Sequence, residues 1–98
     1  MMIRIDGAWH GLDRRQVEQI LSDPAVFDVP KAPAGVIGLV YYGGQIVPVL
    51  EHPEARGKAG KRRFVVLVRD GGALRGLAVD EVTEKFVFEE ENIDQIYR

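Results

Sequence analysis

Short apolar segments, in which hydrophobic and polar residues mostly alternate, follow one another along the chain with turn residues between them. Met2 to Ile5 and Ala8 to Leu12 form one such pair around the hairpin dipeptide Asp6-Gly7. The stretch "VIGLVYYGGQIVPVL", residues 36–50, forms a second pair around Gly43-Gly44, and glycine adopts the positive φ that a tight turn needs. Pro48 has no N–H to donate, so its position is expected at a sheet edge or bulge.

The segment "LDRRQVEQILSDP" has a different pattern and predicts a short helix. Asp13 is placed as its N-cap with Gln16 three residues later, and Asp23-Pro24 would end it. The apolar positions of one helix face follow at helical spacing: Val17, Ile20 and Leu21. Further strands are expected in "RFVVLV" and "GLAVDEVTEKFVF". Six to eight short strands about ten residues apart, with one helix, predict a mainly β fold, a small barrel or sandwich.

Composition limits the classes of protein that remain. Ninety-eight residues with 46% hydrophobic content are expected to form one domain, residues 1–98. The net charge of −2 provides no sequence-wide basic field for nucleic acid. Cysteine is absent, and no apolar run approaches the roughly 20 residues that cross a bilayer. A cytoplasmic protein without direct membrane insertion is expected.

Residues for catalysis or metal binding are scarce. Ser22 is the only serine and Thr83 the only threonine, and Ser22 precedes Asp-Pro with no sign of a shaped pocket. His10 and His52 lack the three or four convergent ligands of a metal site. The acidic cluster near the end is typical of a hydrated tail. No phosphate-binding glycine loop fits, so we predict a non-enzyme without a cofactor or metal.

The run "RGKAGKRR", residues 56–63, is the one local basic patch. It has no interleaved aromatic residue on which bases could stack, which favours a solvated connector. A nucleic-acid-associated module that uses this loop is the less favoured alternative.

Four blocks in order resemble CheW-like domains, the adaptors of bacterial chemotaxis arrays: "HGLDRRQVEQIL", "VPKAPAGVIGLVYYGGQIVPVLE", "RRFVVLV" and "GLAVDEVTE". The resemblance implies a pair of small intertwined SH3-like β-barrels. It implies a scaffold that joins the cytoplasmic tip of methyl-accepting chemoreceptors to the CheA-type histidine kinase, without catalysis. Val17, Phe64 and Val82 match positions that line the receptor-binding groove of the family. All three are apolar, so core packing is the competing interpretation.

Two departures from the family pattern bear on function. The family hairpin usually reads "NLRG" where this chain has Tyr41, Tyr42, Gly43 and Gly44, so Gly43 replaces a functional arginine. The resemblance then leaves two alternatives open: kinase coupling is weakened or lost, or Tyr41 and Tyr42 provide the missing contact.

The second departure is length. Family members continue after "VDEVTE" with further strands, whereas the chain stops at Arg98. Either the last barrel is C-terminally shortened or a second copy supplies strands, as in a homodimer. In its short length, the chain resembles short, divergent accessory members of the family, such as the FrzB type.

Overall fold

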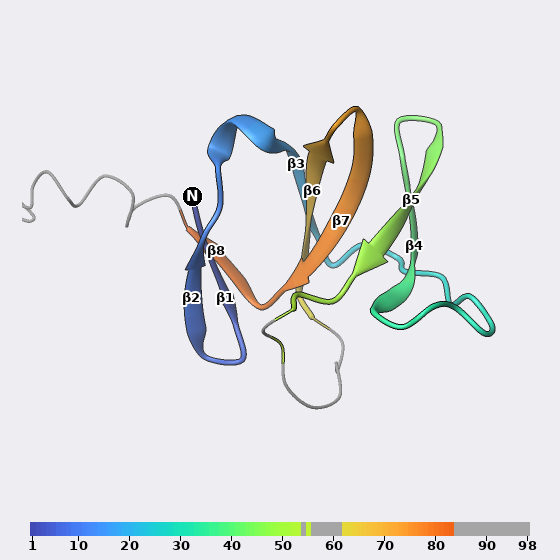
Figure 1. Ribbon diagram of the computed structural model, residues 1–98, viewed down its shortest axis with the longest axis horizontal. Helices are drawn as coiled ribbons and strands as arrows, with labels where there is room; N and C mark the ends of the chain where they lie inside the picture. The colour runs from blue at the N-terminus through green and yellow to red at the C-terminus, as the bar shows by residue number, and fades with distance from the viewer. Residues whose placement is uncertain (54, 56–61, 84–98) are drawn as a thin grey trace, which may run out of the picture.

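The computed structural model describes residues 1–53, 55 and 62–83, which form two β-sheets (Figure 1). The elements in chain order are β1 (Met2–Ile5), β2 (Ala8–Gly11), the 3₁₀ turn η1 (Arg14–Gln16), β3 (Val17–Ser22), β4 (Val36–Tyr42), β5 (Gln45–Leu50), β6 (Phe64–Asp70), β7 (Ala73–Val79) and β8 (Glu81–Thr83). A three-stranded sheet has the order β2-β1-β8, and a five-stranded sheet has the order β3-β6-β7-β5-β4. The mainly β prediction is confirmed.

Both sequence-predicted hairpins are present, because their turns are specified locally. Asp6 and Gly7 have φ of 51° and 83°, and Gly43 and Gly44 have φ of 57° and 79°. Positive φ at both central residues is the geometry of the two-residue turns that match strand twist. β5 pairs with β7 only at Val49 and Leu50, so the ladder on that side begins after Pro48. The tail beyond Thr83, with its predicted strand, lies outside the described residues.

The predicted helix is wrong. Asp13 does accept a hydrogen bond from the backbone N of Arg15 at 3.0 Å, but only the single turn η1 follows, and Val17 is already extended. β3 then pairs with β6, and a register shift between Val17 and Gln19 marks a bulge. The bulge places Val17 and Ile20 on the same face at a spacing of three residues, which imitates helical periodicity.

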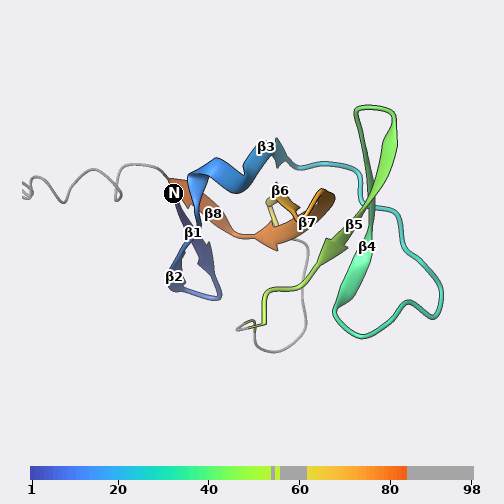
Figure 2. The ribbon, with the colours of Figure 1, turned by 45° about the horizontal axis from the view of Figure 1, so that its top comes forward.

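The inter-sheet core lies between the two sheets. Ile3 and Ile5 from β1 pack against Val66 and Val79 from β6 and β7, and all four are almost fully buried. The two views of the ribbon place β1, β2 and β8 together to one side of β6 and β7 (Figures 1 and 2).

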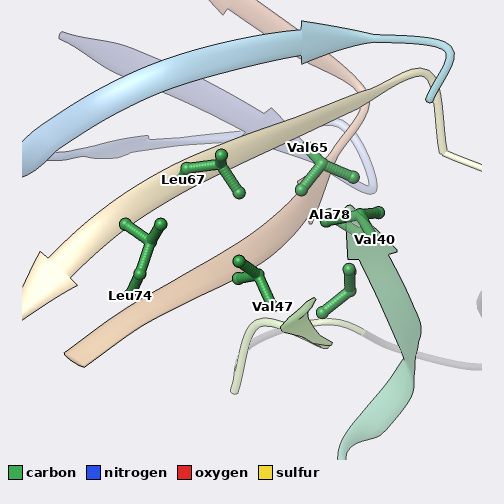
Figure 3. Close-up of a cluster of buried hydrophobic side chains, with 7 residues drawn as sticks. Val40, Val47, Val65, Leu67, Leu74 and Ala78 are labelled. Atoms are coloured by element: carbon green, nitrogen blue, oxygen red, sulfur yellow. The ribbon is translucent and has the colours of Figure 1, made fainter. Parts of the chain in front are cut away.

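The main core lies on the other face of the five-stranded sheet. Its members come from four strands: Val40, Val47, Val49, Val65, Leu67, Leu74 and Ala78. The side chains labelled in Figure 3 point toward one another. Successive residues of β6 therefore face two different cores, which explains its continuous apolar sequence. The sheet curls around this core, in agreement with an SH3-like barrel.

A two-residue bridge ties the chain beyond β3 to β4 at the opposite edge of the same sheet. Phe27 and Leu39 exchange backbone hydrogen bonds of 2.8 and 2.9 Å. Gly38 allows this approach, because a Cβ there would lie 2.6 Å from the carbonyl O of Phe27 and 2.7 Å from Cγ1 of Val26.

The variant Gly38→Ala should therefore lower the free energy of unfolding by about 1–3 kcal/mol, the usual cost of overpacking. Urea denaturation measures this cost, and amide exchange at Phe27 and Leu39 should accelerate. Gly11→Ala is the matched control, because its Cβ would meet only Sδ of Met2 at 3.9 Å. Equal stability of the two alanine variants would contradict the role of Gly38.

Candidate protein-docking surfaces

The three residues of the predicted groove, Val17, Phe64 and Val82, all belong to the apolar layer between the sheets. Each is half-buried and packs against the inter-sheet core. Val17 lies opposite Val68 and Phe64 opposite Val79, while Val82 on β8 lies opposite Ile3. Val17 on β3 therefore lies beside a residue four positions along β6 from Phe64, which separates Val17 and Phe64 by about 13 Å in the strand direction.

An open hollow of about 520 Å³ lies along β3. We call it the β3 hollow, and its lining residues are Met1, Arg14, Arg15, Val17, Glu18, Gln19 and Ile20. Of the three predicted groove residues, only Val17 lines it. The half-buried Val17 and Ile20 form an apolar floor, and the neighbouring side chains form a charged and polar rim.

Charged groups of this rim already have partners on the chain. Arg15 forms an ion pair with Asp13, with Nη2 3.2 Å from Oδ2, and its hydrogen bonds to Asp13 lower the pKa of that carboxyl. Glu18 pairs with Arg69 on β6 at 3.0 Å. Both pairs are exposed, and such pairs contribute little to stability.

The β4–β5 hairpin presents one of its two tyrosines to solvent. The side chain of Tyr41 is 68% exposed, whereas Tyr42 is half-buried against the main core. Gly43 and Gly44 form the turn, and the space around their missing Cβ atoms is open. The hairpin therefore offers Tyr41 and the turn to a partner, and uses Tyr42 for packing.

Beside Tyr41 lies a second, wholly apolar hollow of about 210 Å³, the hairpin hollow, lined by Phe27, Leu39, Val40, Tyr41 and Ile46. Phe27 and Ile46 are 56% and 58% exposed. Neither residue was among the predicted site residues. The two-residue turn in the sequence could have predicted the position of Ile46. This turn places Ile46 opposite Tyr41, so both side chains lie on the same face of the hairpin.

Arg62 is not available to a phosphate, which weakens the nucleic-acid alternative. Its side chain is only 6% exposed. Nη1 donates to Oδ1 of Asp6 at 3.1 Å and to Oδ1 of Asp80 at 3.0 Å, and Nη2 donates to Oε2 of Glu51 at 3.2 Å. Burial alone would lower the pKa of Arg62, but the three carboxylates more than offset this and raise it. Residues 56–61 of the basic loop lie outside the described residues.

His10 and His52 come together, although they are 42 positions apart in the chain. Their ring centroids are 4.6 Å apart. Within residues 1–53, 55 and 62–83, no three histidine, cysteine, aspartate or glutamate side chains gather as a metal site requires. In the same part of the chain, no helix has the length and apolar character needed to span a membrane.

The sequence matches the family model of the CheW-like domain over residues 1–98, so the chain belongs to this family of scaffold and adaptor domains. Its fold is similar to the crystal structure of the scaffolding protein TtCheW from Thermoanaerobacter tengcongensis, with a TM-score of 0.74 and 27% sequence identity. That match covers 85% of this chain and 60% of the TtCheW chain. No curated protein matches the chain.

Proposed function

We propose that the protein is a non-catalytic cytoplasmic adaptor that binds the helical tip of a chemoreceptor in the β3 hollow. The observation that carries this proposal is the position of Val17. It occupies the place that the family resemblance gives to the receptor-binding surface, and it lines an open hollow on an accessible strand.

The shape and chemistry of the β3 hollow suit a helix. Val17 and Ile20 provide apolar contact, and the rim provides polar and charged groups. Helix-in-groove recognition uses apolar anchors about one helical turn apart, surrounded by polar contacts. Phe64 and Val82 act as supports in this proposal, because they pack against the inter-sheet core and do not line the hollow.

Titration of the purified protein with a receptor-tip fragment and, separately, with the regulatory domain of the kinase tests this function. Calorimetry should show saturable one-to-one binding of the tip fragment. Weaker binding of the kinase domain is expected, because Gly43 replaces the arginine of the family hairpin. Failure of the tip fragment to bind would refute the proposal, and kinase binding of equal strength would refute weakened coupling.

A second candidate function is full coupling to the kinase through the hairpin hollow. The observation that favours it is the exposure of Phe27, Tyr41 and Ile46 around one apolar depression. Exposed apolar groups gathered in this way mark interaction surfaces. Tyr41, and not Tyr42, would then make the contact.

The variant Gly43→Arg separates the two candidates. If coupling is weak because the arginine is missing, this variant should bind the kinase domain about tenfold more tightly, as a charge-assisted contact of about 1.4 kcal/mol would give. The positive φ of 57° should cost about 1–2 kcal/mol of stability. Gly43→Gln has the same backbone cost without the charge. Equal kinase binding by Gly43→Arg and Gly43→Gln would contradict the weakened-coupling explanation.

A further inference from the structure

The rim of the β3 hollow carries a local excess of positive groups on an acidic chain. Two arginines, Arg14 and Arg15, line the hollow with one carboxylate, Glu18. The whole chain has a net charge of −2. The rim of the β3 hollow is therefore more positive than the chain as a whole.

The turn η1 fixes the position of both arginines next to the apolar floor. Oδ1 of Asp13 accepts a hydrogen bond from the backbone N of Arg15 at 3.0 Å. The carbonyl O of Asp13 accepts one from the backbone N of Gln16, also at 3.0 Å. Val17 begins the strand directly afterwards. Arg14 and Arg15 are thus the first and second residues after the N-cap Asp13, and they lie at the edge of the surface that Val17 and Ile20 form.

The carboxylate partner of Arg15 holds this arginine only weakly. Glu18 forms its ion pair with Arg69 on the neighbouring strand, at 3.0 Å. The side chain of Arg15 is 91% exposed although it pairs with Asp13. Exposed pairs are worth about 0–1 kcal/mol, so a carboxylate of a docked partner can compete for Arg15.

We propose that the β3 hollow selects a helix that presents a carboxylate within one turn of an apolar side chain. The apolar side chain contacts Val17 and Ile20, and the carboxylate pairs with Arg14 and Arg15. Residues three or four apart on a helix have Cβ atoms about 5–6 Å apart, and a guanidinium holds a carboxylate in a directed two-bond geometry. This inference rests on the proposed function and adds the acidic character of the partner to it.

Charge reversal tests the inference, with a receptor-tip fragment as the probe. Arg14→Glu and Arg15→Glu should each weaken tip binding about tenfold or more at low salt, and the difference from the unmodified protein should shrink as salt rises. Arg75→Glu is the matched control for Arg15→Glu. Arg75 is also an exposed arginine with an exposed carboxylate partner, Asp70 at 3.8 Å, but it lies outside the hollow. Binding by Arg75→Glu should stay within about twofold of the unmodified protein.

Replacement of the carboxylates on the tip fragment by lysine, one at a time, completes the test. One of these lysine variants of the tip fragment should bind Arg15→Glu as well as the original fragment binds the unmodified protein. The same lysine variant should bind the unmodified protein more weakly. This reciprocal result indicates a direct ion pair between the two replaced residues. If the unmodified protein binds the tip and both reversed variants bind equally well, charge selection is wrong and the adaptor function stands. If the unmodified protein does not bind the tip, both the function and this inference fail.

Discussion

Replacement of Arg62 by methionine should lower the free energy of unfolding by about 3–5 kcal/mol, the range for removing one partner of a buried ion pair. Arg62 joins Asp6 of the first turn, Glu51 after β5 and Asp80 between β7 and β8. Asp80 also accepts a hydrogen bond from the backbone N of Asp6 at 2.9 Å. Methionine would leave three carboxylates close together without a cation, at the junction of the two sheets.

Thermal unfolding and urea titration measure this effect. For a domain of this size, the loss corresponds to a fall in Tm of about 12 °C or more. Arg69→Met is the matched control, because it removes only exposed contacts, the ion pair with Glu18 and a hydrogen bond of 3.3 Å to the carbonyl O of Gly72. It should cost less than about 1 kcal/mol. A difference of less than 1 kcal/mol between the two methionine variants would show that the Arg62 cluster does not hold the sheets together.

The variant Val17→Gln should weaken binding of the receptor-tip fragment by about 30-fold, or about 2 kcal/mol, the scale of an interface hot spot. The substitution removes apolar contact from the floor of the β3 hollow and adds a polar group without charge. Binding is measured by calorimetry, together with Tm to confirm that the variant folds.

The control for Val17→Gln is Val26→Gln, which makes the same chemical change at a valine that is 37% exposed and lies beside Phe27. Its affinity for the tip should remain within about twofold of the unmodified protein. Unchanged tip binding by a folded Val17→Gln variant would place the receptor contact elsewhere on the surface.

Local signals in the sequence predicted the hairpins and the β class. Asp6-Gly7 and Gly43-Gly44 specify their turns by backbone conformation alone, so no knowledge of distant residues is needed. The helix prediction failed because the spacing of Val17, Ile20 and Leu21 also fits a bulged strand whose half-buried side chains pack against a core on each face. Only the pairing with β6, more than 40 residues away, decides between them.

The parts of the sites that the sequence did not reveal depend on contacts distant in the chain. The three carboxylate partners of Arg62 lie 11, 18 and 56 residues away, so the basic run gave no indication that this arginine is buried. Phe27 and Ile46 meet only because the Phe27–Leu39 bridge brings the chain beyond β3 to the hairpin. Of the three residues that the family resemblance predicts for the groove, Val17 lines the β3 hollow, and its contact with a receptor stays a prediction.

Disulfide mapping tests most directly whether a receptor tip occupies the β3 hollow, because the chain contains no cysteine and each introduced cysteine is unique. Gln19→Cys places a thiol in the lining of the hollow, and Gln45→Cys places one at the exposed hairpin. With single-cysteine variants along a receptor-tip helix, Gln19→Cys should form crosslinks at positions spaced three or four residues apart, and Gln45→Cys should form few. Crosslinks that concentrate at Gln45→Cys, or their absence at Gln19→Cys while binding persists, would contradict the placement of the partner in this hollow.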